Sequence, residues 1–258
     1  MPLKVENFGR VRKVSFNRPD KLNVFDNLQF AEVRDALSAA DVSAEVAVVV
    51  LTGNGSAFSA GQDLHDMQRI IDGKIEEHHF PSFLESLSNF GKPLIGAVNG
   101  VAVGIGMTLL AYCDIVLMSR ETRLRAPFPQ LGLAPEAGSS GLFVSQMGWQ
   151  NAAYTLFSGD WVSAEEALKF GYIWKISEPS ELQQEAMELA GKISENPILS
   201  LVETKKLMLA SGKHQLGREC HVREVEAYRK LMGGALNSEA ARAFFEGRPV
   251  DFSRMPEF

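Results

Sequence analysis

The chain has 258 residues, 45% of them hydrophobic and 22% charged, and a formal net charge of −6 at pH 7. This length and composition exclude a largely disordered chain and are typical of a globular protein of one or two domains. The acidic balance excludes a global basic field for nucleic acid, so an anionic ligand needs a local basic pocket.

The first predicted elements are a hairpin, a helix and a buried strand. The stretch "LKVENFGRVRKVSFNRP" alternates apolar and polar residues around a turn at Gly9, which predicts a β-hairpin. The next apolar residues fall on one face of a helix: Phe30, Val33, Leu37 and Ala40. The β-branched run "EVAVVVLTGNG" at 45–55 indicates a buried strand with a parallel or stacked partner.

The uncharged stretch "LIGAVNGVAVGIGMTLLAYC" at 94–113 allows two interpretations. Its twenty residues and the spacing of Gly96, Gly100 and Gly104 fit a transmembrane helix with a dimerisation face. However, Asn99 interrupts it, four glycines dilute its hydropathy, and no second span follows. We therefore expect a strand, a turn and a buried helix, and no contact with a membrane.

The last third of the sequence is nearly all helical. Ser163 and Glu166 form the pattern of a capping box at the start of a helix. Apolar residues then recur at helical spacing to the end of the chain. We expect a boundary near Pro197, which separates an α/β core at 1–195 from a helical region at 196–258.

Cysteine and histidine usage indicates the compartment and argues against a metal. The two cysteines, Cys113 and Cys220, are far apart, so a disulfide framework is not indicated and a reducing compartment fits. The five histidines show no ligand spacing, so we expect no metal site. The first residues lack the apolar core of a signal peptide, and "RMPEF" is not a peroxisomal address, so we expect a cytoplasmic protein.

Two loops place small residues just before a predicted helix, "SAGQDL" at 59–64 and "VAVGIGM" at 101–107. Glycine lets a ligand approach the main chain, and the first N–H groups of a helix have no partner within it and carry partial positive charge. The backbone amides of Gln62 and Ile105 are therefore candidates to hold one carbonyl oxygen. Alternatively, each loop only packs a strand closely on a helix.

In this order, these loops and their neighbours resemble the enoyl-CoA hydratase/isomerase family, also called the crotonase superfamily. The matching stretches are "VSFNRPDKLNVF" (14–25), "AFSAGQDLHDM" (57–67), "KPLIGAVNGVAVGIGMTLLAYCDI" (92–115), "FPQLGLAPEAGSSGLF" (128–143) and "FSGDWVSAEEALKFGYI" (157–173). The resemblance covers nearly the whole chain and is weaker in the C-terminal helices. It implies an α/β fold, a crotonase-like spiral of ββα units, with a C-terminal helical trimerisation region that makes a homotrimer or a dimer of trimers.

The resemblance implies an acyl-CoA substrate, with coenzyme A as part of the substrate and no further cofactor. The thioester carbonyl would lie between the amides of Gln62 and Ile105, although the family often has glycine where Ile105 stands. The implied substrate-binding residues are Lys21, Leu22, Ala60, Asp63, Leu64, His65, Gly104, Phe128 and Arg248. Lys21 and Leu22 would flank the adenine, and Arg248 would reach a phosphate.

Several of these residues have simpler interpretations. Asp63 fits a helix N-cap better than a catalytic role, His65 fits an exposed helix position, and Arg248 fits a solvated charge. The acyl tail would lie against residues that serve equally well as core: Met67, Ile70, Ile71 and Phe83. The resemblance therefore indicates where the substrate binds more firmly than it indicates which residue makes each contact.

The acid–base residues decide which reaction the family resemblance implies. Hydratases of the family have two glutamates, at positions that here hold Thr108 and Phe128. Neither side chain is an acid or base near neutral pH, so efficient hydration is not expected. The stretch "LGLAPEAGSS" resembles the segment of Δ3-Δ2-enoyl-CoA isomerases that carries their single catalytic glutamate. We therefore expect an isomerase that moves a double bond from the β,γ to the α,β position, with Glu136 as its acid and base.

The neighbours of Glu136 fit this role. Leu131, Leu133 and Phe128 should desolvate the carboxyl and raise its pKa, which makes it a stronger base. The alternative is a structural acid at the N-terminus of the following helix. Two further functions stay open: another crotonase-type enzyme, such as a hydratase, thioesterase or dehalogenase, or a protein that binds acyl-CoA without turnover.

Overall fold

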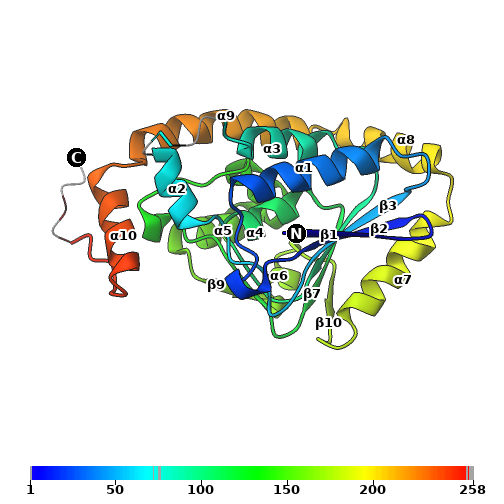
Figure 1. The fold of residues 1–258 in the computed structure, drawn as a ribbon, viewed down its shortest axis with the longest axis horizontal. Helices are drawn as coiled ribbons and strands as arrows, with labels where there is room; N and C mark the ends of the chain where they lie inside the picture. Colours follow the sequence, from blue (N-terminus) through cyan, green and yellow to red (C-terminus); the bar gives the residue numbers. More distant parts are fainter. Residues whose placement is uncertain (1, 72, 75–76, 254, 256–258) are drawn as a thin grey trace.

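Two β-sheets form the framework of the computed structural model, which describes residues 2–71, 73–74, 77–253 and 255 (Figure 1). The larger sheet has the strand order β1-β2-β3-β5-β7-β10, and the smaller has the order β4-β6-β8-β9. The strands of the larger sheet are β1 (Leu3–Phe8), β2 (Val11–Phe16), β3 (Val48–Gly53), β5 (Leu94–Val98), β7 (Ile115–Ser119) and β10 (Lys175–Ser177). Those of the smaller are β4 (Ala57–Ser59), β6 (Val101–Val103), β8 (Arg123–Arg125) and β9 (Trp161–Ser163).

The first strands confirm the hairpin and the buried strand predicted from the sequence. β1 and β2 pair antiparallel, with Phe8 opposite Val11 and Gly9 between them at a φ of 58°. β3 is buried along its whole length and pairs parallel with β2 and β5. Its β-branched residues fit because both faces of a parallel strand are covered.

Ten helices surround the two sheets in the described part of the chain. They are α1 (Asn27–Asp41), α2 (Leu64–Ile71), α3 (Phe80–Asn89), α4 (Ile105–Thr108), α5 (Ser139–Ser158), α6 (Ala164–Lys169), α7 (Leu182–Ser194), α8 (Ile198–Leu209), α9 (Lys213–Leu231) and α10 (Ala235–Phe245). Short 3-10 turns lie at η1 (Pro19–Lys21), η2 (Leu109–Tyr112) and η3 (Pro129–Leu131). The predicted capping box is confirmed, because Ser163 and Glu166 bond each other's backbone N–H at the start of α6.

The elements repeat in a pattern that positions the loops. Each of β3, β5 and β7 leads into a short strand of the smaller sheet, and each short strand leads toward a helix. β4, β6 and β8 are parallel neighbours, so their C-terminal ends lie at one edge of the smaller sheet. The chain segments that follow these ends are the ones predicted to carry the site.

The stretch 94–113 has the predicted order of strand, turn and buried helix. It forms β5, β6, α4 and η2, which end at Tyr112. Gly100 is required at the turn, since a β-carbon there would lie 2.0 Å from the carbonyl oxygen of Ser56. No helix in the described ranges is both long enough and apolar enough to cross a membrane.

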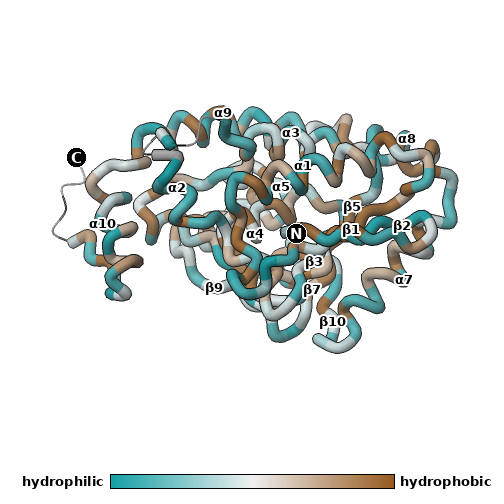
Figure 2. The backbone as a smooth tube through the Cα atoms, viewed as in Figure 1, coloured by the Kyte–Doolittle hydropathy of each residue, from teal (hydrophilic) through white to brown (hydrophobic). Residues whose placement is uncertain are grey.

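Two apolar clusters stabilise the layers, and the tube in Figure 2 is brown where the strands pass through the middle of the molecule. The larger cluster includes fully buried aromatic rings such as Phe16, Phe25 and Phe83. In the smaller cluster, Leu182 and Ala186 of α7 pack on the larger sheet. The helix α9 runs along the upper side of the molecule and packs against α3 and α5, while α10 lies at the far end (Figure 1).

Candidate active site

Gln62 and Ile105 lie in adjacent loops at the edge of the smaller sheet. Phe25 N–H donates a 2.8 Å hydrogen bond to the Gly61 carbonyl, and Asp63 N–H donates one of 2.9 Å to the Phe25 carbonyl. In this parallel bridge the N–H of Gln62 itself points away from Phe25. Ile105 is the first residue of α4, so its N–H is one of the unpaired groups of a helix N-terminus.

The same edge brings Glu136 to these loops. A β-carbon on Gly104 would lie 4.0 Å from Glu136 Oε1 and 4.0 Å from the Cα of Gly61. The two glycine loops and the carboxyl group are therefore immediate neighbours, although they come from three different repeats of the fold. Glycine at position 104 keeps this space open and also has a positive φ of 52°.

The loop that carries Glu136 is held in an unusual backbone conformation. Ala137 has a φ of 60° and Gly138 a φ of 71°, and the left-handed region is unfavourable for alanine. The Ser139 hydroxyl donates a 2.6 Å hydrogen bond to the Glu136 carbonyl, and the Tyr112 hydroxyl donates one of 2.8 Å to the Ala137 carbonyl. These contacts fix the turn at which the helix α5 begins.

The Glu136 carboxyl is desolvated. Glu136 is 8% exposed, and no described residue donates a hydrogen bond to its carboxyl oxygens. Its pKa is raised to about 8, mainly by burial and second by the charge of Glu224. A carboxyl in this state is a far better base when ionised than an exposed glutamate and is a ready acid when protonated.

A cavity of about 570 Å³ adjoins Gln62 and Glu136. Much of its remaining wall comes from α9 and the residue that caps its C-terminus: His221, Glu224, Val225, Tyr228, Arg229 and Met232. Sequence reasoning missed these residues, because the helical spacing of Val225, Tyr228 and Met232 indicates a buried face but not what that face covers. Burial lowers the pKa of His221 and raises that of Tyr228, so both side chains favour their neutral forms.

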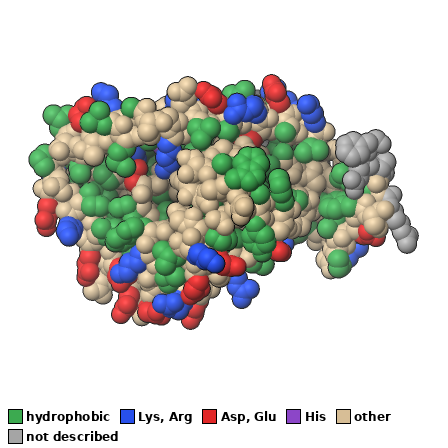
Figure 3. Space-filling view, turned by 180° about the vertical axis from the view of Figure 1, so that it is seen from behind, with side chains coloured by type: hydrophobic (Ala, Val, Ile, Leu, Met, Phe, Trp, Pro, Cys, Tyr) green, Lys and Arg blue, Asp and Glu red, His purple; other side chains and the backbone are tan. Residues whose placement is uncertain are grey.

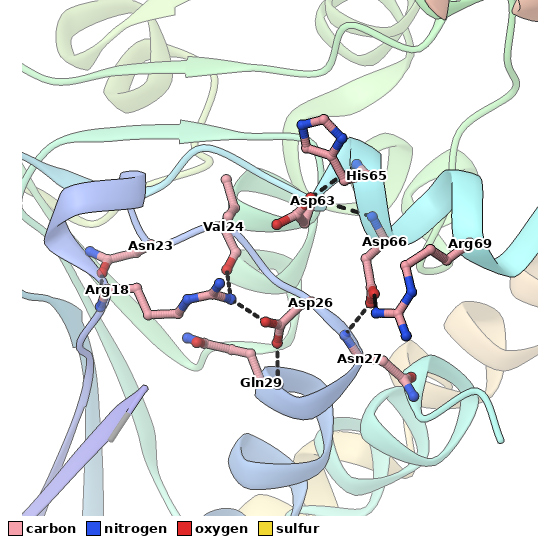
Figure 4. Close-up of polar contacts among 10 residues, drawn as sticks. All are labelled: Arg18, Asn23, Val24, Asp26, Asn27, Gln29, Asp63, His65, Asp66 and Arg69. Carbon is pink, nitrogen blue, oxygen red and sulfur yellow. Dashed lines mark hydrogen bonds and ion pairs between the residues drawn. The ribbon is translucent and has the colours of Figure 1, made fainter. Parts of the chain in front are cut away.

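Asp63 is the N-cap residue of α2, as preferred from the sequence. Its carboxylate accepts the N–H of His65 at 3.0 Å, and that of Asp66 at 3.4 Å (Figure 4). Asp66 in turn accepts the N–H of Asn27 at 2.6 Å, which ties α2 to the start of α1. An ion pair in the same view joins Arg18 to Asp26, the N-cap of α1, at 2.5 Å.

The segment with Lys21 and Leu22 is anchored to the first loop. Ala60 N–H donates to the Leu22 carbonyl at 2.9 Å, so the predicted residues Leu22 and Ala60 are in contact. The side chains of Lys21 and Leu22 are exposed on the surface, as a contact with the adenine end of a ligand requires. Leu22 has a φ of 51°, which turns the chain sharply at this point.

Other predicted residues lie farther from the cavity. Leu64 lines a separate cavity of about 150 Å³ with Phe245, and the ring of His65 lies 5.2 Å from that of Phe245. Arg248 pairs with Glu239 and Glu246, each at 2.6 Å, in its own C-terminal segment. Its guanidinium is therefore already neutralised within the described chain.

The positions of the two missing acids are occupied by buried, non-titrating side chains. Thr108 is fully buried in α4, and Phe128 is 4% exposed at the start of η3. Of the predicted acyl-tail residues, Met67 lines the larger cavity and Phe83 is fully buried, whereas the side chains of Ile70 and Ile71 lie outside the described residues. Among the described residues, no group of three His, Cys, Asp or Glu side chains is placed to hold a metal ion.

Comparisons with known proteins agree with this arrangement. Residues 6–255 match the sequence model of the family described as enoyl-CoA hydratase/isomerase. The chain is similar to 1,2-epoxyphenylacetyl-CoA isomerase of Escherichia coli, with 30% identity over 94% of this chain and 95% of that protein. It is also similar to human enoyl-CoA delta isomerase 2, with 32% identity over 93% of this chain and 61% of that protein. Other relatives of similar identity are named as hydratases.

A solved structure confirms the predicted fold. The crystal structure of an enoyl-CoA hydratase/isomerase from Pseudoalteromonas atlantica superposes with a TM-score of 0.92, at 31% identity, over 98% of this chain and 100% of that chain. The crotonase-like α/β architecture expected from the sequence is therefore shown by both the sequence relatives and the spatial arrangement of the sheets.

Proposed function

Because the chain belongs to the enoyl-CoA hydratase/isomerase family, we propose that it moves the double bond of an enoyl-CoA thioester from the β,γ to the α,β position. The observation that carries this proposal is the single desolvated carboxyl of Glu136, with a pKa raised to about 8, beside the loops of Gln62 and Ile105. One acid–base group is what a carbon-to-carbon proton shift needs.

In the proposed mechanism, ionised Glu136 takes a proton from the α carbon of the β,γ-enoyl thioester. The electron pair moves through the carbonyl to give a dienolate whose negative charge lies on the thioester oxygen. The protonated Glu136 then returns the proton to the γ carbon, and the double bond ends between the α and β carbons. No atom is lost or gained, and the carboxyl is ionised again at the end.

The backbone amides of Gln62 and Ile105 would hold the developing oxyanion. The amide of Gln62 points away from its strand neighbour, and that of Ile105 is at a helix N-terminus, so both are available donors with partial positive charge. One donor of this kind typically lowers a barrier by roughly 2.7–4 kcal/mol. The carboxyl contributes roughly 10²–10⁴-fold in rate, so both features are needed.

Hydration, the activity named for several relatives, is less well supported by this site. Addition of water needs a group that activates water and a route for a proton to carbon, and Thr108 and Phe128 supply neither. A second carboxylate, Glu224, does line the cavity, but both of its oxygens accept backbone N–H groups. Glu136 is thus the carboxyl in this cavity without such partners among the described residues.

We also propose that the substrate-binding residues and the assembly follow the family. Lys21 and Leu22 would flank the adenine, and the helices of 196–258 would build a homotrimer. Large apolar side chains that are exposed support association, among them Trp149, Phe157, Leu199 and Leu207. Figure 3 shows hydrophobic side chains gathered over the middle of the face turned away in Figure 1. The two free cysteines are both buried and support a reducing, cytoplasmic setting.

The test is direct conversion of a β,γ-enoyl-CoA, followed by the absorbance of the conjugated thioester. The wild-type protein should convert it, and Glu136→Gln should lose roughly 10²–10⁴-fold of the rate, because the amide neither takes nor returns a proton. Glu121→Gln is the matched control, since Glu121 is exposed on a turn. Full activity of Glu136→Gln would exclude the mechanism, and a 3-hydroxyacyl-CoA product would favour a hydratase.

A further inference from the structure

Glu224 connects the C-terminal helix α9 to the loop that carries Glu136. Its carboxylate accepts the N–H of Gly138 at 2.6 Å through Oε2 and the N–H of Ser140 at 2.8 Å through Oε1. The residue is 5% exposed, although it is separated from this loop by more than eighty positions in the sequence. We infer that Glu224 is a positioning residue that holds the Glu136 loop in place from α9.

The loop requires such a contact because its backbone conformation is unfavourable on its own. Ala137 has a φ of 60°, which costs a non-glycine residue free energy that the surroundings must offset. A β-carbon on Gly138 would lie 2.5 Å from the Gly217 carbonyl oxygen, so α9 and the loop pack backbone against backbone. Glu224 lies two turns farther along the same helix. Its carboxylate accepts the N–H groups of Gly138 and Ser140 in this loop.

The hydrogen bonds assign Glu224 a positioning role rather than a role in proton transfer. Gly138 is the N-cap residue of α5 and Ser140 lies in its first turn, so the carboxylate is at the positive end of a long helix. Both oxygens accept backbone N–H groups, so neither is left free to exchange a proton with a substrate. Glu224 therefore supplies a fixed negative charge beside Glu136 as well as a mechanical link.

That charge contributes to the chemistry of Glu136. Burial is the main reason for the raised pKa of Glu136, and the Glu224 carboxylate is the second. The titratable and charged groups that share the cavity with Glu136 are His78, His221, Glu224, Tyr228 and Arg229. The nearby histidine on α9, His221, has Nδ1 4.0 Å from Glu224 Oε2, and burial lowers its pKa, which favours the neutral imidazole.

This inference rests on the proposed function only in that it takes Glu136 as the acid and base of the reaction. Its test has a readout that needs no substrate. The full-length protein is labelled with ¹³C at the glutamate side-chain carboxyl, and Glu136 is assigned from the signal missing in Glu136→Gln. The carboxyl signal is then titrated in the wild type, in Glu224→Gln and in Glu226→Gln. Glu226 is exposed on the same helix and is the matched control.

We expect Glu136 to titrate near pH 8 in the wild type and in Glu226→Gln, and at lower pH in Glu224→Gln, because a like charge has been removed. In the isomerisation assay, Glu224→Ala should lower kcat by roughly 10²-fold with KM nearly unchanged, since a misplaced base still leaves the binding surface intact. Glu224→Gln should recover part of that loss, because its amide oxygen can still accept one N–H group.

Two results would overturn the inference. One is an unchanged Glu136 titration in Glu224→Gln, and the other is an equal shift in Glu226→Gln. If Glu224→Ala does not fold, the near-isosteric Glu224→Gln decides the question through the titration alone. If the wild-type protein converts no β,γ-enoyl-CoA, the proposed function fails, while the titration still decides whether Glu224 acts on Glu136.

Discussion

The hydroxyl of Tyr112 donates a 2.8 Å hydrogen bond to the carbonyl of Ala137, the residue directly after Glu136. Tyr112 is 1% exposed in η2, and desolvation raises the pKa of its hydroxyl. The bond therefore joins a neutral, buried donor to the one alanine of this loop that has a positive φ. Tyr112 is not among the described residues that line the cavity beside Glu136.

Removal of this donor should weaken the loop. We expect Tyr112→Phe to lower the free energy of unfolding by roughly 1–3 kcal/mol, because a buried carbonyl loses its partner. kcat should fall while KM changes little, since the cavity wall is untouched. Chemical denaturation and steady-state kinetics measure both effects. Wild-type stability together with wild-type kcat would show that the loop keeps its shape without this bond.

The pH dependence of kcat/KM should report Glu136. The carboxyl must be ionised to take the α proton, and its pKa is raised to about 8. The rate should therefore rise roughly tenfold per pH unit below that value and level off above it. A profile measured from pH 5 to 9 tests this. A rate that is already at its plateau at pH 6 would contradict a desolvated base.

Stability should show the opposite trend, because the folded pKa of Glu136 lies above its unfolded value. The folded protein keeps the proton while the unfolded chain releases it, so stability falls as pH rises from about 4.5 to about 8. Glu136→Gln should remove this loss, with an upper limit of roughly 5 kcal/mol at pH 8. At pH 4 both states of the wild type are protonated, and the two proteins should unfold at similar denaturant concentrations.

The oxyanion proposal predicts different outcomes for two substitutions in the glycine loops. Ile105→Pro removes one N–H donor at the first position of a helix, where proline is tolerated, and also changes a fully buried side chain; it should lower kcat roughly 10²–10³-fold. Gln62→Ala keeps its backbone amide and should stay close to wild type. Ile105→Val is the control that changes the side chain alone. Equal loss in Ile105→Pro and Ile105→Val would assign the effect to packing.

Local patterns predicted the elements and the loops of the site. The hairpin around Gly9 and the capping box of Ser163 and Glu166 depend on residues within a few positions of each other, and both are confirmed. The N-cap role preferred for Asp63 is also confirmed by its bonds to two N–H groups. Such features are set by short-range geometry, so the sequence alone is sufficient to find them.

The contribution of α9 to the cavity was not predictable in the same way. Periodicity indicates that Val225 and Tyr228 lie on a buried face, but not that they share a cavity with Glu136, roughly ninety positions earlier. A glutamate such as Glu224 on a charged helix is indistinguishable in sequence from a solvated one. Its partners, the amides of Gly138 and Ser140, become adjacent only when α9 docks on α5.

The parallel order of β4, β6 and β8 has a consequence for how such a protein changes its reaction over evolutionary time. Every loop that leaves these strands reaches the same rim, so an acid can disappear from one loop and arise in another without a new scaffold. Thr108, Phe128 and Glu136 lie in or near such loops, and two of them carry no acid. In this fold the loop that supplies the carboxyl can therefore change, while the two backbone amides that hold the oxyanion keep their positions.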